Sequence, residues 1–422
     1  MARHRIMILT MLAFSGMLFS QNAEKTASVD TAGIAVIMKE YTGSAAESDT
    51  IVAQDVHPQD SPADRGFLII SADQKAELRI RGSIRVNGAY DFNGLQNQNF
   101  FSTVDIPVGD ANKTEPRFFM GVNQTRMGIE AKRATPIGDV FIRVEMDFLG
   151  VGGNALRLRH AYGQTEVFLA GQTWTTFSDV SSFPLTVELL GPNSAIIERT
   201  VQFRYFRDAS EDFRWSVAVE SPRPDIGKPD TLQIEPAFQS FPDIAGRLRK
   251  YGDWGHVQLA AILRSIVIKS VNNERDGLIG YGGLLTGKIN FTERNILLYQ
   301  AVYGKAISGF IKALSGKGLD VVYNPTTREF ETVASVGGYV SYRRIWRPHL
   351  SSYFTAGLVK VVNKDFQPGD AFSLSRYISV DLFWEASPGV RLGVEYSWGQ
   401  RVNKNDESGT ANRLSSIVYY DF

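Results

Sequence analysis

The sequence contains no cysteine and only five histidines in its 422 residues. The missing thiols exclude cysteine nucleophiles, cysteine metal sites and a disulfide framework, and they are compatible with an envelope protein that folds without oxidation. The histidines stand at positions 4, 57, 160, 256 and 349, and this spacing is not that of metal ligands. We therefore expect no metal and no cofactor.

The chain also lacks an excess of charge of one sign and a long internal apolar run. Its 45 basic and 45 acidic residues give a formal net charge of zero, so no overall field favours nucleic acid as a partner. Beyond the N-terminus, no apolar run approaches the ~18 residues of a membrane-spanning helix. No P-loop, G-x-S-x-G or dinucleotide-binding motif stands in its strand–turn–helix context. We do not expect an enzyme; a lipid hydrolase at a barrel edge is the enzyme alternative.

The N-terminus has the features of an export signal. Arg3 and Arg5 precede an apolar run that ends at Phe19, and this run is shorter than the ~20 residues that span a bilayer. We predict a cleaved signal peptide over residues 1–22. Residues 23–66 are polar and predict a flexible periplasmic segment, which leaves residues 67–422 for one folded domain.

An alternation of apolar and polar residues is the main positive signal. At the C-terminus, Leu414, Val418 and Phe422 share one parity, and Arg413 and Asp421 share the other. Side chains alternate across a strand with period two, so these residues predict a strand with one apolar and one polar face. Sixteen such runs are predicted over residues 78–91, 117–132, 138–149, 155–163, 166–174, 198–207, 212–220, 242–250, 254–264, 277–289, 293–304, 331–344, 350–362, 375–386, 389–401 and 411–422.

The connections between these runs alternate between short and mostly longer ones. An even strand number, short turns on one side and long loops on the other are typical of outer-membrane barrels, and closing the sheet removes its unpaired edges. We predict a 16-stranded antiparallel transmembrane β-barrel with short periplasmic turns, longer external loops and a third loop folded into the pore. The last strand should pair with the first over residues 78–90, and the apolar face should contact lipid.

The polar face should line a water-filled lumen, where its charges would select solutes. Arginines predominate on that face in the first nine strands, and those we expect to line the pore and guide substrate are Arg126, Arg143, Arg157, Arg159, Arg204, Arg214, Arg247, Arg249 and Arg264. Such a stripe would concentrate small anions. The alternative is that wall carboxylates pair with these arginines, which then only brace the barrel.

The connection over residues 175–197 is the candidate constriction, because its composition is unusually apolar for an exposed loop. Its expected site residues are Trp174, Phe177, Asp179 and Glu188. Two histidines lie on predicted strands. His160 has the parity of the lipid face, where a subunit contact is expected, and His256 is expected to be inward and structural.

Three sequence blocks resemble a known family. Leu156-Arg-Leu-Arg-His-Ala-Tyr-Gly163 and Phe168-Leu-Ala-Gly-Gln-Thr-Trp-Thr-Thr-Phe-Ser-Asp179, with Pro242-Asp-Ile-Ala-Gly-Arg-Leu-Arg249, are similar to the DcaP-like trimeric porins of Gram-negative bacteria. The resemblance implies a homotrimer of sixteen-stranded barrels whose arginines guide dicarboxylate-like anions. The matching positions here are Arg157, Arg159, Arg204, Arg247 and Arg249, with Trp174 and Asp179 at the loop.

Together these features predict a porin of the Gram-negative outer membrane that passes small hydrophilic solutes, with a preference for small organic anions. The expected partners are outer-membrane lipid, further copies of the chain and the barrel-assembly machinery, for which Phe422 resembles the terminal aromatic signal. The alternative is a structural or adhesive barrel with a closed lumen, which would insert into a bilayer without conducting.

Overall fold

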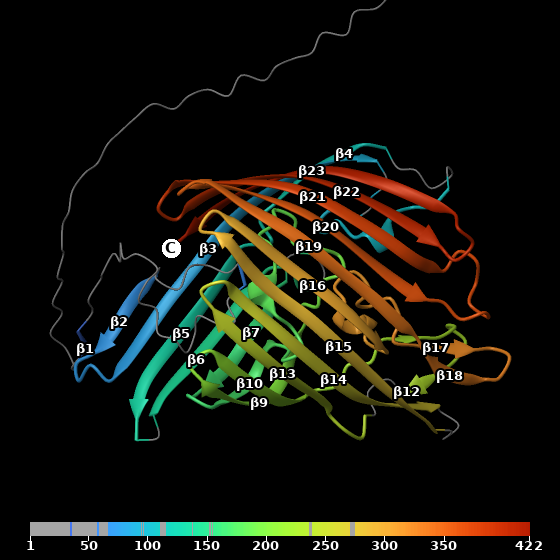
Figure 1. Cartoon of the computed structure of the whole chain (residues 1–422), viewed down its shortest axis with the longest axis horizontal. Helices are drawn as coiled ribbons and strands as arrows, with labels where there is room; N and C mark the ends of the chain where they lie inside the picture. The colour runs from blue at the N-terminus through green and yellow to red at the C-terminus, as the bar shows by residue number, and fades with distance from the viewer. Residues whose placement is uncertain are drawn as a thin grey trace, which may run out of the picture.

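The computed structural model describes residues 34–35, 57–58, 66–93, 95, 97–109, 115–136, 138–151, 153, 155–235, 239–270 and 275–422. The predicted signal peptide over residues 1–22 lies outside these, as does most of the predicted segment 23–66. The chain forms a closed antiparallel barrel of 16 strands (Figure 1). Within the described residues, no helix is both long enough and apolar enough to cross a membrane.

The predicted strands are confirmed, with ends that differ by a few residues. They are β3 (Ala76–Asn93), β4 (Arg117–Gly121) continued by β5 (Arg126–Thr135), β6 (Gly138–Asp147), β7 (Arg157–Gln164), β8 (Phe168–Trp174), β9 (Arg199–Ser210), β10 (Phe213–Glu220), β13 (Asp243–Gly252), β14 (Gly255–Ser270), β15 (Arg275–Thr292), β16 (Asn295–Lys305), β19 (Ala334–Arg347), β20 (Leu350–Val362), β21 (Phe372–Ser387), β22 (Val390–Asn403) and β23 (Ser408–Asp421). A turn at Val122–Thr125 splits the second predicted strand, since the amide of Thr125 donates to the carbonyl of Val122 at 2.9 Å.

The barrel closes between its last and first strands, as predicted. β23 pairs with β3, where Leu414 lies opposite Tyr90 and Asp421 opposite Ser83. The amide of Phe422 then donates to the carbonyl of Gly82 at 3.0 Å. Below this point, β2 (Phe67–Ser71) pairs with the start of β3, and β1 (Ile34–Ala35) pairs with β2. The edge of β3 is therefore paired beyond the end of β23.

The outer and inner faces have opposite character. On β23, the outward Leu414, Val418 and Tyr420 are 43–52% exposed, whereas the inward Arg413 and Asp421 are 1% and 6% exposed. The same division holds around the wall, and so much exposed apolar area is stable only against another apolar phase. The apolar side chains thus lie on the outer face of the barrel, and the charged ones on its inner face.

The loop between β8 and β9 (residues 175–198, the β8–β9 loop) makes hydrogen bonds to distant strands. The Val187 amide donates to Asp381 Oδ1 on β21 at 3.2 Å, and Ser194 Oγ donates to the carbonyl of Gly338 on β19 at 2.8 Å. Most of its side chains are buried, and a short 3-10 turn, η4 (Val180–Ser182), lies within it. The loop is therefore a packed segment that is held by hydrogen bonds to β19 and β21.

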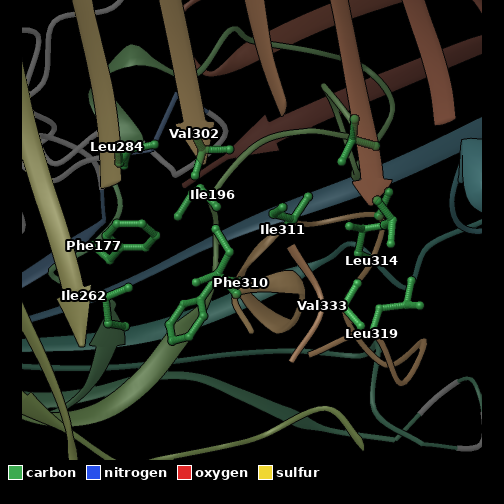
Figure 2. Packing of buried hydrophobic residues seen from close by; sticks show 14 of the residues in the cluster. Phe177, Ile196, Ile262, Leu284, Val302, Phe310, Ile311, Leu314, Leu319 and Val333 are labelled. Atoms are coloured by element: carbon green, nitrogen blue, oxygen red, sulfur yellow. The ribbon is translucent and has the colours of Figure 1, made fainter. Parts of the chain in front are cut away.

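Two further connections contribute to a hydrophobic cluster with the β8–β9 loop. The β3–β4 loop contains η2 (Thr103–Asp105), and the β16–β19 connection contains η5 (Ser308–Phe310), β17 (Val321–Asn324) and β18 (Glu329–Thr332). Figure 2 shows Ile262, Leu284 and Val302 of the wall pointing toward Phe177 and Phe310. Two short strands, β11 (Ile226–Gly227) and β12 (Ile234–Glu235), complete the β10–β13 connection; β11 pairs with β17.

Candidate functional site

An ion-pair network covers the inner face of β6 and β7. Arg159 donates to Glu145 at 2.5 Å and to Asp147 at 3.0 Å, while Arg157 holds both oxygens of Asp147 at 2.9 and 2.6 Å. Arg143 completes the group with a 2.5 Å bond to Glu145. Each carboxylate is thus shared by two arginines, a charge-assisted arrangement that fixes the guanidinium planes.

The network continues on β3 and β5. Arg81 lies 2.6 Å from Glu130 and 4.0 Å from Glu145, and Arg143 lies 3.7 Å from Glu130. Arg126 is buried on the same inner face, in register with Asp147 across the β5–β6 pair. Within this network, the four arginines at positions 81, 143, 157 and 159 share three carboxylates, which leaves one positive charge in excess.

A β-bulge on β7 corrects the prediction for His160. Glu145 pairs with His160 and the next residue, Met146, pairs with Leu158, so Arg159 is inserted into the strand. A bulge places two residues opposite one, which interrupts the alternation of faces. Arg159 and His160 are consequently both buried inside, at 3% and 1% exposure. The prediction that His160 faces lipid was wrong.

Trp174, at the end of β8, lies between a cation and an imidazole. The Arg199 guanidinium carbon stands 3.8 Å from the Trp174 ring centre, and the ring of His57 stacks at 5.5 Å. His57 also lies 4.6 Å from the ring of Phe183 in the β8–β9 loop. Neither contact can be predicted from local sequence patterns, because His57 belongs to a polar segment and Arg199 follows a long loop.

Asp179 anchors the first half of the β8–β9 loop. Its oxygens accept from Arg249 Nη2 at 2.6 Å and Thr286 Oγ1 at 2.8 Å, and they lie 2.8 Å from His256 Nε2. Burial disfavours the carboxylate, but Arg249 and His256 outweigh it and hold the pKa of Asp179 well below its usual range. The sequence prediction of an inward, structural His256 agrees with this contact.

Glu188 anchors the second half of the same loop. Its carboxylate accepts from the amides of Phe101 and Leu190, each at 2.7 Å, and its own amide donates to Glu395 at 2.7 Å. Burial raises the pKa of Glu188 to about 7, Arg413 at 3.7 Å opposes the shift, and the nearby Glu395 adds to it. Glu188 is therefore close to half-protonated at neutral pH.

The remaining predicted arginines have partners in the wall or the loops. Arg204 donates to Gln202 at 3.0 Å and to the carbonyl of Trp174 at 2.5 Å. Arg247 lies 3.4 Å from Ser216.

Besides Arg249, two of the predicted arginines form ion pairs away from the β6–β7 network. Arg264 is 1% exposed and contacts Asp243 at 3.0 Å and Asp320 at 2.7 Å. Arg214 pairs with Asp208 at the exposed short-turn end, at 2.6 and 2.7 Å.

Lys312, in the β16–β19 connection, faces the arginine network. Its side chain is half-buried, and its charge is influenced by Glu198, Arg199, Arg157 and Arg159. Enclosure by the surrounding protein, together with the three arginines, lowers the pKa of Lys312 to about 8 against the opposing effect of Glu198. Lys312 is still mainly protonated at neutral pH, so it adds a positive charge near Arg157 and Arg159.

Among the described residues, no group of three or more histidine, aspartate or glutamate side chains is arranged to hold a metal ion. The carboxylates of the inner wall instead accept from arginines, backbone amides and hydroxyls, as Glu220 does from Thr175 and Thr200. What this arrangement can do is present fixed positive charge to a solute.

The chain was compared with known families and structures. The model of the DcaP outer membrane protein family matches residues 57–422. The outer membrane channel DcaP of Acinetobacter baumannii is 20% identical, with a TM-score of 0.72 over 85% of this chain and 99% of that one. An anion-selective porin from Comamonas acidovorans (11% identity, TM-score 0.55, 82% and 100% covered) has a similar fold. OmpT of Vibrio cholerae also has a similar fold, with 11% identity and a TM-score of 0.52 over 82% of this chain and 98% of that one. A search of curated proteins finds no match.

Proposed function

Because this chain belongs to the DcaP outer membrane protein family, we propose that it is a passive porin that prefers small organic anions. The family and the barrel locate the chain in the outer membrane of a Gram-negative bacterium. We infer the charge selectivity and the class of solute from the charged side chains of the inner wall.

The observation that carries the proposal is the excess of arginine over carboxylate around Glu145 and Asp147. Each carboxylate is neutralised by two guanidiniums, and Arg157 keeps 35% of its side chain exposed while doing so. Lys312 adds a further cation on the facing side. A water-filled passage with this balance raises the local concentration of anions, because low-dielectric walls focus the field of fixed charges.

The same contacts bear on the alternative that the arginines only brace the wall. Arg264 and Arg159 are 1% and 3% exposed, and each pairs with two carboxylates. In our proposal these buried arginines hold the wall, whereas the half-buried Arg157 and Lys312 meet the solute. Fewer residues thus contact the solute than the nine arginines that alternation predicts.

We propose further that the β8–β9 loop constricts the pore and that Asp179 and Glu188 hold it in place. The buried ion pair of Asp179 with Arg249 and the hydrogen bonds of Glu188 support this role. Phe177, which is fully buried, anchors the loop by packing rather than by charge.

We also propose a homotrimer that contacts outer-membrane lipid and is inserted by the barrel-assembly machinery. One structure similar in fold is described as a trimer form of OmpT from Vibrio cholerae. Cross-linking of the purified protein in detergent should yield a species of three chains; a monomer at all concentrations would contradict the trimer.

A second function, that of a structural barrel with a closed lumen, is favoured by one specific observation. Phe177, Phe310 and Ile311 pack with wall residues into a buried cluster inside the barrel (Figure 2). This cluster fills part of the lumen that a wide channel would leave open.

Single-channel recording in planar bilayers decides between the two functions. A porin gives discrete, steady conductance steps, and in liposome-swelling assays it admits small organic acids faster than neutral sugars of similar size. Insertion without conductance would establish the structural alternative instead.

A further inference from the structure

A cavity lies inside the barrel at the end where the strands are joined by short turns. It has a volume of about 320 Å3 and is lined by side chains of β19 to β22 together with Leu185 of the β8–β9 loop and Pro58. Its volume falls within the range of small-molecule sites, roughly 300–1,000 Å3. None of its lining residues belongs to the arginine network of β6 and β7, so it is a separate site.

Two arginines give the cavity its charge. Arg343 and Arg391 both line it, and their guanidinium carbons stand 5.5 Å and 5.7 Å from the ring centres of Tyr353 and Tyr419. In the described part of the chain, neither arginine has a carboxylate within 4 Å, and the buried Nε of Arg343 has no hydrogen-bond partner. A buried donor without a partner is energetically costly. An anion that enters the cavity would accept a hydrogen bond from the Nε of Arg343.

One acidic residue also lines the cavity. Glu385 is opposite Arg391 across the β21–β22 pair, but its nearest ionisable partner is His349 Nδ1 at 4.0 Å. Its side chain is 42% exposed, so water screens its charge at the rim. Two guanidiniums against one solvated carboxylate leave the cavity positive.

The rest of the lining is apolar. Leu185, Tyr353 and Phe383 belong to one buried hydrophobic cluster, and Ile345 packs against it. An apolar floor beside fixed cations suits a ligand with a hydrocarbon body and a carboxylate. The floor buries the hydrocarbon, and the guanidinium fork donates to the two carboxylate oxygens.

We propose that this cavity binds a small monocarboxylate with an apolar or aromatic body, on the short-turn side of the β8–β9 loop. This inference rests on the proposed function only for the path by which the ligand arrives, since an anion would reach the cavity by diffusing through the lumen. The site explains why two arginines remain without carboxylate partners here, whereas the arginines of β6 and β7 are paired.

The test is a saturation-transfer NMR titration of the purified full-length protein in detergent, with benzoate as the probe. Benzyl alcohol, which lacks the charge, and acetate, which lacks the apolar body, are the ligand controls. Arg343→Ala and Arg391→Ala should each weaken benzoate binding about tenfold or more, as expected for loss of a charge-assisted hydrogen bond. Arg347→Ala is the matched control, because this exposed arginine ends the same strand outside the cavity.

Folding is checked by heat-modifiable mobility in gels. Arg391→Lys keeps the charge and removes the fork, so it should bind benzoate with intermediate affinity even if an alanine variant fails to fold. Benzoate binding no tighter than that of benzyl alcohol, or binding unchanged in the arginine variants, would overturn the site. Cation-selective conductance with benzoate binding intact would overturn the proposed function and leave the site standing.

Discussion

Glu188 is a buried carboxyl group whose protonation changes near neutral pH. Arg413 faces it from β23, and Glu395 and Asp381 face the loop tip from β22 and β21. The pKa of Glu188 is raised from 4.5 to about 7 in the folded protein. Between pH 4.5 and about pH 7, the folded protein therefore keeps a proton that the unfolded chain has released. The contribution of Glu188 to the free energy of unfolding is therefore complete below about pH 4.5 and falls as the pH rises. It is lost above about pH 7, which lowers the free energy of unfolding by about 3 kcal/mol.

The corresponding prediction concerns the pH dependence of the channel. The β8–β9 loop should be held more weakly at pH 8 than at pH 5, so current fluctuations should increase with pH. Glu188→Gln removes the titration and should flatten the profile, although it loses one of the two amide contacts. If Glu188→Gln keeps the wild-type pH profile in single-channel recordings, Glu188 is not the responsible group.

Asp179 provides a second residue whose contribution can be measured. Asp179→Asn leaves Arg249 without its buried counter-ion, and breaking such a pair typically costs about 3–5 kcal/mol. We expect a lower melting temperature and noisier conductance. Asp212→Asn is the control, since the ion pair of Asp212 with Lys250, at 3.6 Å, is exposed to solvent. Equal effects of the two substitutions would refute the anchoring role.

Among the elements, the strands were predictable from sequence and the packed loops were not. Alternation identifies a strand because the lipid and the lumen impose opposite polarity on successive residues, and β20 was predicted with both ends correct. The bulge at Arg159 was missed because the inserted residue shifts parity without any change in composition. That error placed His160 on the wrong face.

The interior contacts of the loops were missed for a different reason. The segment predicted to form the constriction is largely buried, and its role in the pore stays a prediction. Phe101, Phe310 and Ile311 are buried only against residues far away in the sequence. The same holds for site residues: the pairing of Arg157 with Asp147 follows from strand register, whereas Lys312 and Arg199 approach the network only after the barrel has closed. Local patterns carry no information about such long-range contacts.

The position of His57 leads to a prediction for the segment before the barrel. Its ring packs against Trp174 and Phe183 and is 5% exposed. His57→Ala should free space beside the β8–β9 loop and increase single-channel conductance. His349→Ala is the matched control, because that side chain is 70% exposed; unchanged conductance in His57→Ala would show that the segment does not obstruct the passage.

For the molecule as a whole, the closing strand pair is the point where assembly can be tested. The Phe422 ring packs so closely on Gly82 that a Cβ atom there would lie 2.5 Å from the ring, and the Phe422 backbone exchanges two hydrogen bonds with Gly82. Deletion of Phe422 should reduce the fraction of folded barrel in membranes several-fold, with near-normal conductance in the channels that form.

A reduced conductance at full assembly would contradict this account of Phe422. Heat-modifiable gel mobility of outer-membrane fractions measures assembly, and bilayer recording of the same material measures conductance. The two readouts together separate a role in insertion from a role in the pore.

The central claim, that the lumen prefers anions, is tested most directly by the zero-current potential in a KCl gradient. For the wild-type protein we predict a zero-current potential with the sign of the chloride equilibrium potential. For Lys312→Glu, whose side chain faces the arginine network, we predict a smaller preference for chloride. Arg328→Glu, at the exposed turn between β17 and β18, changes the net charge equally and should leave the potential unaltered. A potential of the sign set by potassium in the wild-type protein would contradict the account.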